Sequence, residues 1–237
     1  MKRRVGLILP SVNIHMEPEF NRLWDVLPDI DYFATRVFLT DTTEETLVEM
    51  EKGLSGAAEL IETVGPEAVV YACTSGSFIK GPEWDEKIME KITGICHCPS
   101  ITASRAMVNA LQAMGIKKLT LVTPYTDDIN EHEKHFIETM GIEVVAMKGL
   151  QIVDAEILRT QTREQMMELA CSADVASSQG VFISCTNVEG MYIAEELEKK
   201  LGKPVLSSNS ATLWNLLKLL GHSTPVQGCG QLLAQCL

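Results

Sequence analysis

Two cysteines, Cys73 and Cys185, stand at points of the chain where an α/β protein most readily does chemistry. Each follows a short apolar run and precedes small polar residues of the kind that open a helix. Ligands of open α/β sheets bind at the carboxyl ends of strands. Backbone N–H groups of the next turn are expected there to lower the thiol pKa and favour the nucleophilic thiolate. One such cysteine would usually be core packing, but two at equivalent points indicate a shared function.

The residues after each cysteine indicate the kind of substrate. Cys73 is followed by Thr-Ser-Gly-Ser at 74–77, and Cys185 is followed by Thr186 and Asn187. These side chains and turns can donate hydrogen bonds to a carboxylate. Two thiols that flank one cleft suit proton removal and return, or addition and elimination, at a carbon held between them. A small carboxylate is therefore the expected substrate.

The elements that must position these cysteines are predicted by an alternation of apolar runs and helical patterns. Continuous apolar runs are typical of strands buried on both faces of a parallel sheet, and they cover 5–9, 68–72, 119–122 and 180–184. Helical patterns cover 44–64, 83–92, 104–114, 128–140, 164–173, 189–201 and 211–220. The alternation predicts the α/β class with mostly parallel sheets.

The order of these elements repeats along the chain. Pro10 and Pro124 follow equivalent runs, Cys73 and Cys185 follow the next ones, and segment 98–101 resembles 203–206. We therefore predict two similar α/β halves. Residues 1–115 with 208–237 would form the first half, and residues 116–207 the second.

The composition excludes several classes of protein. The 237 residues include 20 Lys and Arg against 32 Asp and Glu, a formal net charge of −12. This balance, with only 5% aromatic residues, argues against binding to nucleic acid or to an anionic membrane. The apolar run near the N-terminus is too short for a signal peptide, and no stretch approaches the ~18–20 residues of a membrane span. We expect a cytoplasmic protein whose seven cysteines are reduced.

Cofactor and metal motifs are weak. No Gly-x-Gly-x-x-Gly opens a helix, and no phosphate-binding loop is present. His132 and His135 share one helix face, but a solvated charged helix explains them better than a metal site does. The compact segment 96–98 (Cys-His-Cys) lacks a second pair of ligands. We expect no cofactor and no metal.

The two cysteine turns, 73–78 and 184–187, resemble the signature turns of the aspartate/glutamate racemase superfamily. Further matches lie in its branch of maleate cis-trans isomerases and arylmalonate decarboxylases: 10–13, 123–130, and 202–209 leading to Trp214. Together they cover nearly the whole chain. The resemblance implies two pseudo-symmetric, Rossmann-like α/β halves with mostly parallel sheets, an active site in the cleft between them, and no cofactor.

The resemblance also implies roles for individual residues. Cys73 would be the nucleophile or first base, and Cys185 the opposing acid. The residues expected to bind the substrate carboxylates are Asn13, Thr74, Ser75, Tyr125, Thr186 and Asn187. In a maleate isomerase the first thiolate adds to the double bond, the new single bond rotates, and elimination gives fumarate.

Alternatives stay open at this point. Arylmalonate decarboxylases keep the second cysteine, as proton donor, but carry another residue where Cys73 stands. Thr74 and Ser75, however, are closer to the decarboxylase pattern. A racemase of amino acids or other carboxylates also fits, as does a two-lobed protein that binds a carboxylate without turning it over. A homo-oligomer, dimer or tetramer, is expected, with no nucleic-acid or membrane partner.

Overall fold

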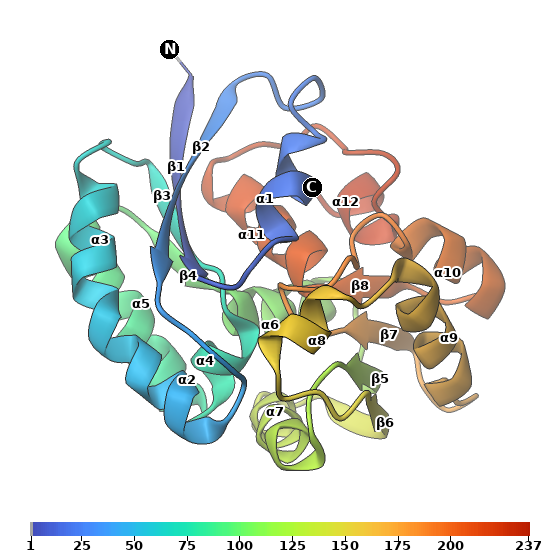
Figure 1. The fold of residues 1–237 in the computed structure, drawn as a ribbon. Helices are drawn as coiled ribbons and strands as arrows, with labels where there is room; N and C mark the ends of the chain where they lie inside the picture. The colour runs from blue at the N-terminus through green and yellow to red at the C-terminus, as the bar shows by residue number, and fades with distance from the viewer. Residues whose placement is uncertain (1) are drawn as a thin grey trace.

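Two four-stranded sheets form the centre of the computed structural model, which describes residues 2–237 (Figure 1). The first sheet has the order β2-β1-β3-β4 and the second the order β6-β5-β7-β8. The strands are β1 (Arg3–Pro10), β2 (Ile30–Val37), β3 (Ala68–Tyr71), β4 (Ser100–Thr102), β5 (Lys118–Thr123), β6 (Glu143–Gly149), β7 (Gly180–Ile183) and β8 (Val205–Ser207). Neighbouring strands within each sheet are parallel. The predicted α/β class with two similar halves is confirmed.

Helices connect the strands and cover the sheets. They are α1 (Met16–Asn21), α2 (Glu44–Met50), the 3-10 helix η1 (Glu51–Gly53), α3 (Leu54–Glu62), α4 (Thr74–Phe78), α5 (Pro82–Cys96), α6 (Ala103–Ala113), α7 (Asp127–Thr139), α8 (Ala155–Arg159), α9 (Arg163–Ala173), α10 (Ala194–Leu201), α11 (Ser208–Leu219) and α12 (Gln231–Gln235). In Figure 1, α3 and α5 lie outside the first sheet, and α9 and α10 lie beside the second. α11 follows the second sheet but packs against α6. The division of the chain at residues 115 and 207 stays a prediction.

The strands that the sequence reveals are the buried ones. β3 and β7 are buried along their whole length, as is β1 from Val5 onward, so their sequences are continuous apolar runs. The edge strands β2, β4, β6 and β8 were not predicted. The side chains of β2 and β6 are only partly buried, so residues such as Asp31 and Lys148 interrupt the apolar pattern. β4 and β8 have only three residues each, too few for a recognisable apolar run.

Two predicted helices are shorter than expected. The pattern over 44–64 is interrupted by η1, so α2 and α3 are separate helices. The pattern over 189–201 yields a helix only from Ala194. Its first residues form a loop because the N–H groups of Gly190 and Met191 donate to the Glu19 carboxylate, 3.2 and 3.0 Å away, instead of entering a helix.

The carboxyl ends of the two sheets face each other. Asn13 follows β1 and donates to Thr186, which follows β7, over 3.1 Å. Thr186 Oγ1 in turn donates to the carbonyl of Ala72, just after β3, at 2.9 Å. The residues that end central strands of both halves therefore meet in one place. Within residues 2–237, no helix has both the length and the apolar character needed to cross a membrane.

Candidate active site

Cys73 lies at the junction of β3 and α4 in the first half. It is the N-cap of α4, and its Sγ accepts a hydrogen bond from the Gly76 N–H at 3.3 Å. The Ser75 hydroxyl lies 3.8 Å from the same sulfur. A Cβ at position 76 would lie 3.1 Å from this sulfur and 2.6 Å from Met50 Cε, which explains why the turn has glycine there. The thiol thus has two potential donors beside it.

Cys185 occupies the equivalent position after β7. Its φ of +92° is unusual for a residue with a side chain. The Cys185 N–H donates to Ser208 Oγ at 3.1 Å, and its Sγ accepts from the Asn187 N–H at 3.3 Å. These two bonds hold the strained backbone in place.

Burial dominates the ionisation of both thiols. Cys73 is 4% exposed and Cys185 is 6% exposed. Desolvation raises the pKa of Cys73 to about 11 and that of Cys185 to about 12, and the neighbouring donors offset this only in part. The expectation that backbone N–H groups would lower both pKa values is therefore wrong for this enclosed arrangement. The donors are present, but the loss of water outweighs them.

Tyr125 connects the two cysteines. It is buried, 1% exposed, and its phenol lies beside the Cys185 thiol. Burial raises the Tyr125 pKa well above its usual range, and the nearby Cys185, Glu133 and Cys73 raise it further. The cysteines also influence each other, because Cys73 contributes to the raised pKa of Cys185. The structure thus brings Cys73, Tyr125 and Cys185 into one cluster.

The other predicted substrate-binding residues border this cluster and already have hydrogen-bond partners. Asn13 Oδ1 accepts from the Met16 N–H at 3.1 Å and so caps the start of α1. Asn187 Oδ1 accepts from the Ile14 N–H at 2.8 Å, and its amide nitrogen donates to the Val12 carbonyl. These contacts tie the second half to the loop after β1. A role for Asn13, Thr186 and Asn187 in holding substrate stays a prediction.

Ser208 was given no role from the sequence. Its hydroxyl is fully buried, accepts from Thr74 Oγ1 at 2.9 Å and accepts from the Cys185 N–H. It therefore links the turn after Cys73 to the backbone of Cys185. The sequence signal was its place in segment 202–209 of the family resemblance, three residues before the predicted helix over 211–220. That place does not reveal that α11 begins at Ser208, between the two cysteine turns.

The segments that follow β2 and β6 contact each other and so connect the two halves. Asp41 and Asp154 form an isolated antiparallel bridge. Thr42 donates from its backbone N–H to the Val153 carbonyl and from its hydroxyl to the Ile152 carbonyl, both at 3.3 Å. We call segments 40–43 and 150–154 the clasp.

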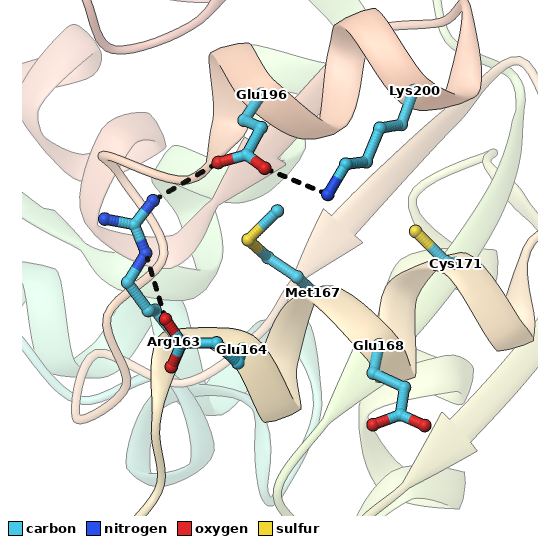
Figure 2. Close-up of a pocket in the computed structure, with 7 residues that line it drawn as sticks. All are labelled: Arg163, Glu164, Met167, Glu168, Cys171, Glu196 and Lys200. Carbon is cyan, nitrogen blue, oxygen red and sulfur yellow. Dashed lines mark hydrogen bonds and ion pairs between the residues drawn. The ribbon is translucent and has the colours of Figure 1, made fainter.

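A surface hollow between α9 and α10 contains neither of these thiols (Figure 2). Glu196 on α10 forms ion pairs there with Arg163, 3.4 Å away, and Lys200, 2.9 Å away. Cys171 on its wall is exposed. Most of the charges there pair with one another, and Glu168 is the lining carboxylate that Figure 2 shows without a partner. No cluster of three potential metal-ligating side chains occurs within residues 2–237.

Fold and site together define a class of two-half α/β proteins that hold a cysteine from each half in one buried cluster. The family model described as arylmalonate decarboxylase matches residues 5–233, and the chain belongs to that family. The resemblance to the racemase-superfamily branch of maleate isomerases and arylmalonate decarboxylases is confirmed.

The relatives of the chain include maleate isomerases and an arylmalonate decarboxylase. The chain is 26% identical to a maleate isomerase of Geobacillus stearothermophilus, over 98% of this chain and 97% of the relative. It is 27% identical to an arylmalonate decarboxylase of Bordetella bronchiseptica, over 96% and 95%. Among solved structures, a cysteine-to-serine variant of Nocardia farcinica maleate cis-trans isomerase with a covalently bound succinylcysteine intermediate superposes with a TM-score of 0.95. That structure is 25% identical and covers 99% of both chains.

Proposed function

We propose that this protein is a cofactor-independent cis-trans isomerase of a small unsaturated dicarboxylate, with maleate as substrate and fumarate as product. The observation that carries the proposal is the pair of enclosed cysteines, Cys73 and Cys185, at equivalent strand ends of two matching halves. Similarity to maleate isomerases, one of them with a succinylcysteine intermediate, supports it.

The proposed reaction uses the two thiols on either side of one double bond. The Cys73 thiolate adds to one alkene carbon, and the Cys185 thiol protonates the carbanion that forms at the other. The carbon–carbon bond is now single and rotates. The Cys185 thiolate then removes the proton, the double bond re-forms in the trans geometry, and the Cys73 thiolate leaves. Substrate and product are isomers, so no oxidant or other co-reactant is needed.

The surroundings support different roles for the two thiols. Cys73 has the Gly76 N–H and the Ser75 hydroxyl beside its sulfur. Cys185 also has donors, but it lies beside the Glu133 carboxyl and the other thiol, which raise its pKa further. Pairs of groups whose environments separate their pKa values divide acid and base roles between them. The lower pKa of Cys73, about 11 against about 12 for Cys185, favours Cys73 as the thiolate and Cys185 as the acid.

Neutral donors would bind the two carboxylates. The hydroxyls of Thr74 and Ser75, the Tyr125 phenol and the Asn13 amide border the thiols. An acidic protein that takes an acidic substrate must bind it by such local donors rather than by its overall field. Cytoplasmic location and homo-oligomeric assembly, as dimer or tetramer, stay predictions.

A decarboxylase is the second candidate. The polar turn at Thr74 and Ser75 and the family match favour it. In that reaction Cys185 would protonate the carbanion left after CO₂ departs, and Cys73 would have no required role. The presence of a positioned Cys73 thiol makes this the weaker candidate.

A proton NMR panel in D₂O separates the candidates. The substrates are maleate, aspartate, glutamate and phenylmalonate, each followed with the purified protein. We expect fumarate to appear from maleate, with no loss of carbon. Deuterium at the α-carbon of an amino acid would indicate a racemase, and CO₂ release from phenylmalonate a decarboxylase. No turnover of any of the four would favour a binding protein.

A further inference from the structure

Glu133 is a buried acid for which the proposed reaction has no use. It lies on α7 and is fully buried. One carboxyl oxygen accepts a hydrogen bond from Ser184 Oγ at 2.5 Å, while the other has no partner. None of the ion pairs in residues 2–237 includes this residue. A buried carboxylate without a cation is costly, so the carboxyl is expected to be protonated.

The position of Glu133 connects it to the thiol cluster. Its partner Ser184 immediately precedes Cys185, and Tyr125 lies at the other side of the same cluster. Glu133 is close enough that its charge would raise the pKa of both Cys185 and Tyr125.

The other elements packed against α7 bring no compensating charge. From α4, the titratable group is the Cys73 thiol at its N-cap. The charged residues of β6, Glu143 and Lys148, are directed to Lys118 and Ser172. Among the residues described here, Glu133 therefore faces thiols and a phenol, and the Ser184 hydroxyl is the one group that stabilises its anion.

We propose that Glu133, held by Ser184, is a positioning residue that must stay uncharged for Cys185 to exchange its proton with the substrate. This inference rests on the proposed function. When Glu133 is neutral, Cys185 can change between thiol and thiolate at little electrostatic cost. When Glu133 is ionised, its negative charge makes Cys185 a weaker acid and slows protonation of the substrate carbanion.

The proposal fixes the direction of a pH effect. Burial raises the pKa of Glu133 to about 8, and the Ser184 hydroxyl limits that rise. Cys73, with a pKa of about 11, gains thiolate as the pH rises in every variant, so the wild type is compared with Glu133→Gln at each pH. The Glu133→Gln variant keeps the acceptor for Ser184 and cannot ionise. For one controlling group, the ratio of wild-type to Glu133→Gln kcat/KM should therefore fall about tenfold between pH 7 and pH 9.

Two further variants make the test specific. Ser184→Ala removes the bond that favours the carboxylate, so its fall in kcat/KM relative to Glu133→Gln should move to higher pH. Glu198→Gln is the matched control, because Glu198 is also buried but accepts from the N–H groups of Val205 and Gln231, away from the two thiols. The ratio of wild-type to Glu198→Gln kcat/KM should stay constant between pH 7 and pH 9. A constant ratio of wild type to Glu133→Gln over the same range would overturn the proposal.

A second measurement does not need activity. The free energy of unfolding is measured from pH 5 to 9 for wild type and Glu133→Gln. Because the folded-state pKa is raised above 4.5 to about 8, stability should fall with rising pH across this window in wild type. The variant should show a smaller fall. If the protein does not isomerise maleate, this comparison still tests whether Glu133 is held neutral, and equal slopes would refute it.

Discussion

At the residue scale, the positions of the two candidate catalytic cysteines were easier to predict than the surroundings of their side chains. The strand-end positions of Cys73 and Cys185 follow from the apolar runs before them, and the structure brings both cysteines together with Tyr125. Their raised pKa values could not be predicted, because desolvation depends on which side chains from the other half enclose the sulfur. Ser208 and Glu133 were missed for the same reason, since their importance lies in contacts across the fold.

Ser208→Ala tests how strongly the Cys185 backbone depends on one hydroxyl. The substitution leaves the buried Cys185 N–H and Thr74 hydroxyl without their acceptor. We expect the free energy of unfolding to fall by about 1–3 kcal/mol and kcat to fall with it.

The matched control for this test is Ser210→Ala on the same helix. Ser210 caps α11 through Ser207 and touches neither cysteine turn. It should lose about 1 kcal/mol of stability while kcat stays near wild type. Equal kcat values for the two variants would contradict a positioning role for Ser208.

At the element scale, buried strands were predictable and edge strands were not. β1, β3, β5 and β7 occupy the middle of their sheets, and each contains a buried, largely apolar run. β2 and β6 lie at the edges and are mostly only partly buried, which permits polar residues. The segments after those two missed strands form the clasp, so its existence could not be predicted either.

The clasp gives a prediction about access to the thiols. Thr42→Ala removes the hydrogen bond from the Thr42 hydroxyl to the second half. The free energy needed to separate the two segments of the clasp should therefore fall by about 1 kcal/mol. Alkylation of Cys73 by iodoacetamide should then be about fivefold faster, measured by peptide mass spectrometry. Thr40→Ala is the control, because Thr40 bonds only to its neighbour Asp41. If Thr42→Ala labels no faster than Thr40→Ala, the clasp does not limit access.

At the scale of the whole molecule, the join between halves contains a second buried acid. Glu19 is 2% exposed and accepts hydrogen bonds from the second-half residues Gly190 and Met191 and from Asn209 on α11. Burial raises its pKa to about 7. The repeat of the two halves was visible in the sequence. The burial of Glu19 was not, because it depends on how the two halves pack against each other.

Glu19 should make the stability of the whole protein depend on pH. Its folded-state pKa lies above the usual 4.5, so its protonated form contributes stability that is complete below about pH 4.5 and is lost as pH rises through 7. Across that window the contribution lost is about 2–3 kcal/mol. Glu19→Gln should flatten the dependence, as measured by urea unfolding at several pH values. An unchanged slope in the variant would show that Glu19 is ionised in the folded protein.

The central claim is that Cys73 forms a covalent adduct that Cys185 then resolves. Its most direct test is intact-mass and peptide mass spectrometry of the Cys185→Ser variant after incubation with maleate. We expect a mass increase of one maleate molecule, mapped to Cys73, and no increase in a Cys73→Ser variant. An unmodified Cys73 in the presence of maleate, with fumarate still produced by the wild type, would contradict the covalent account.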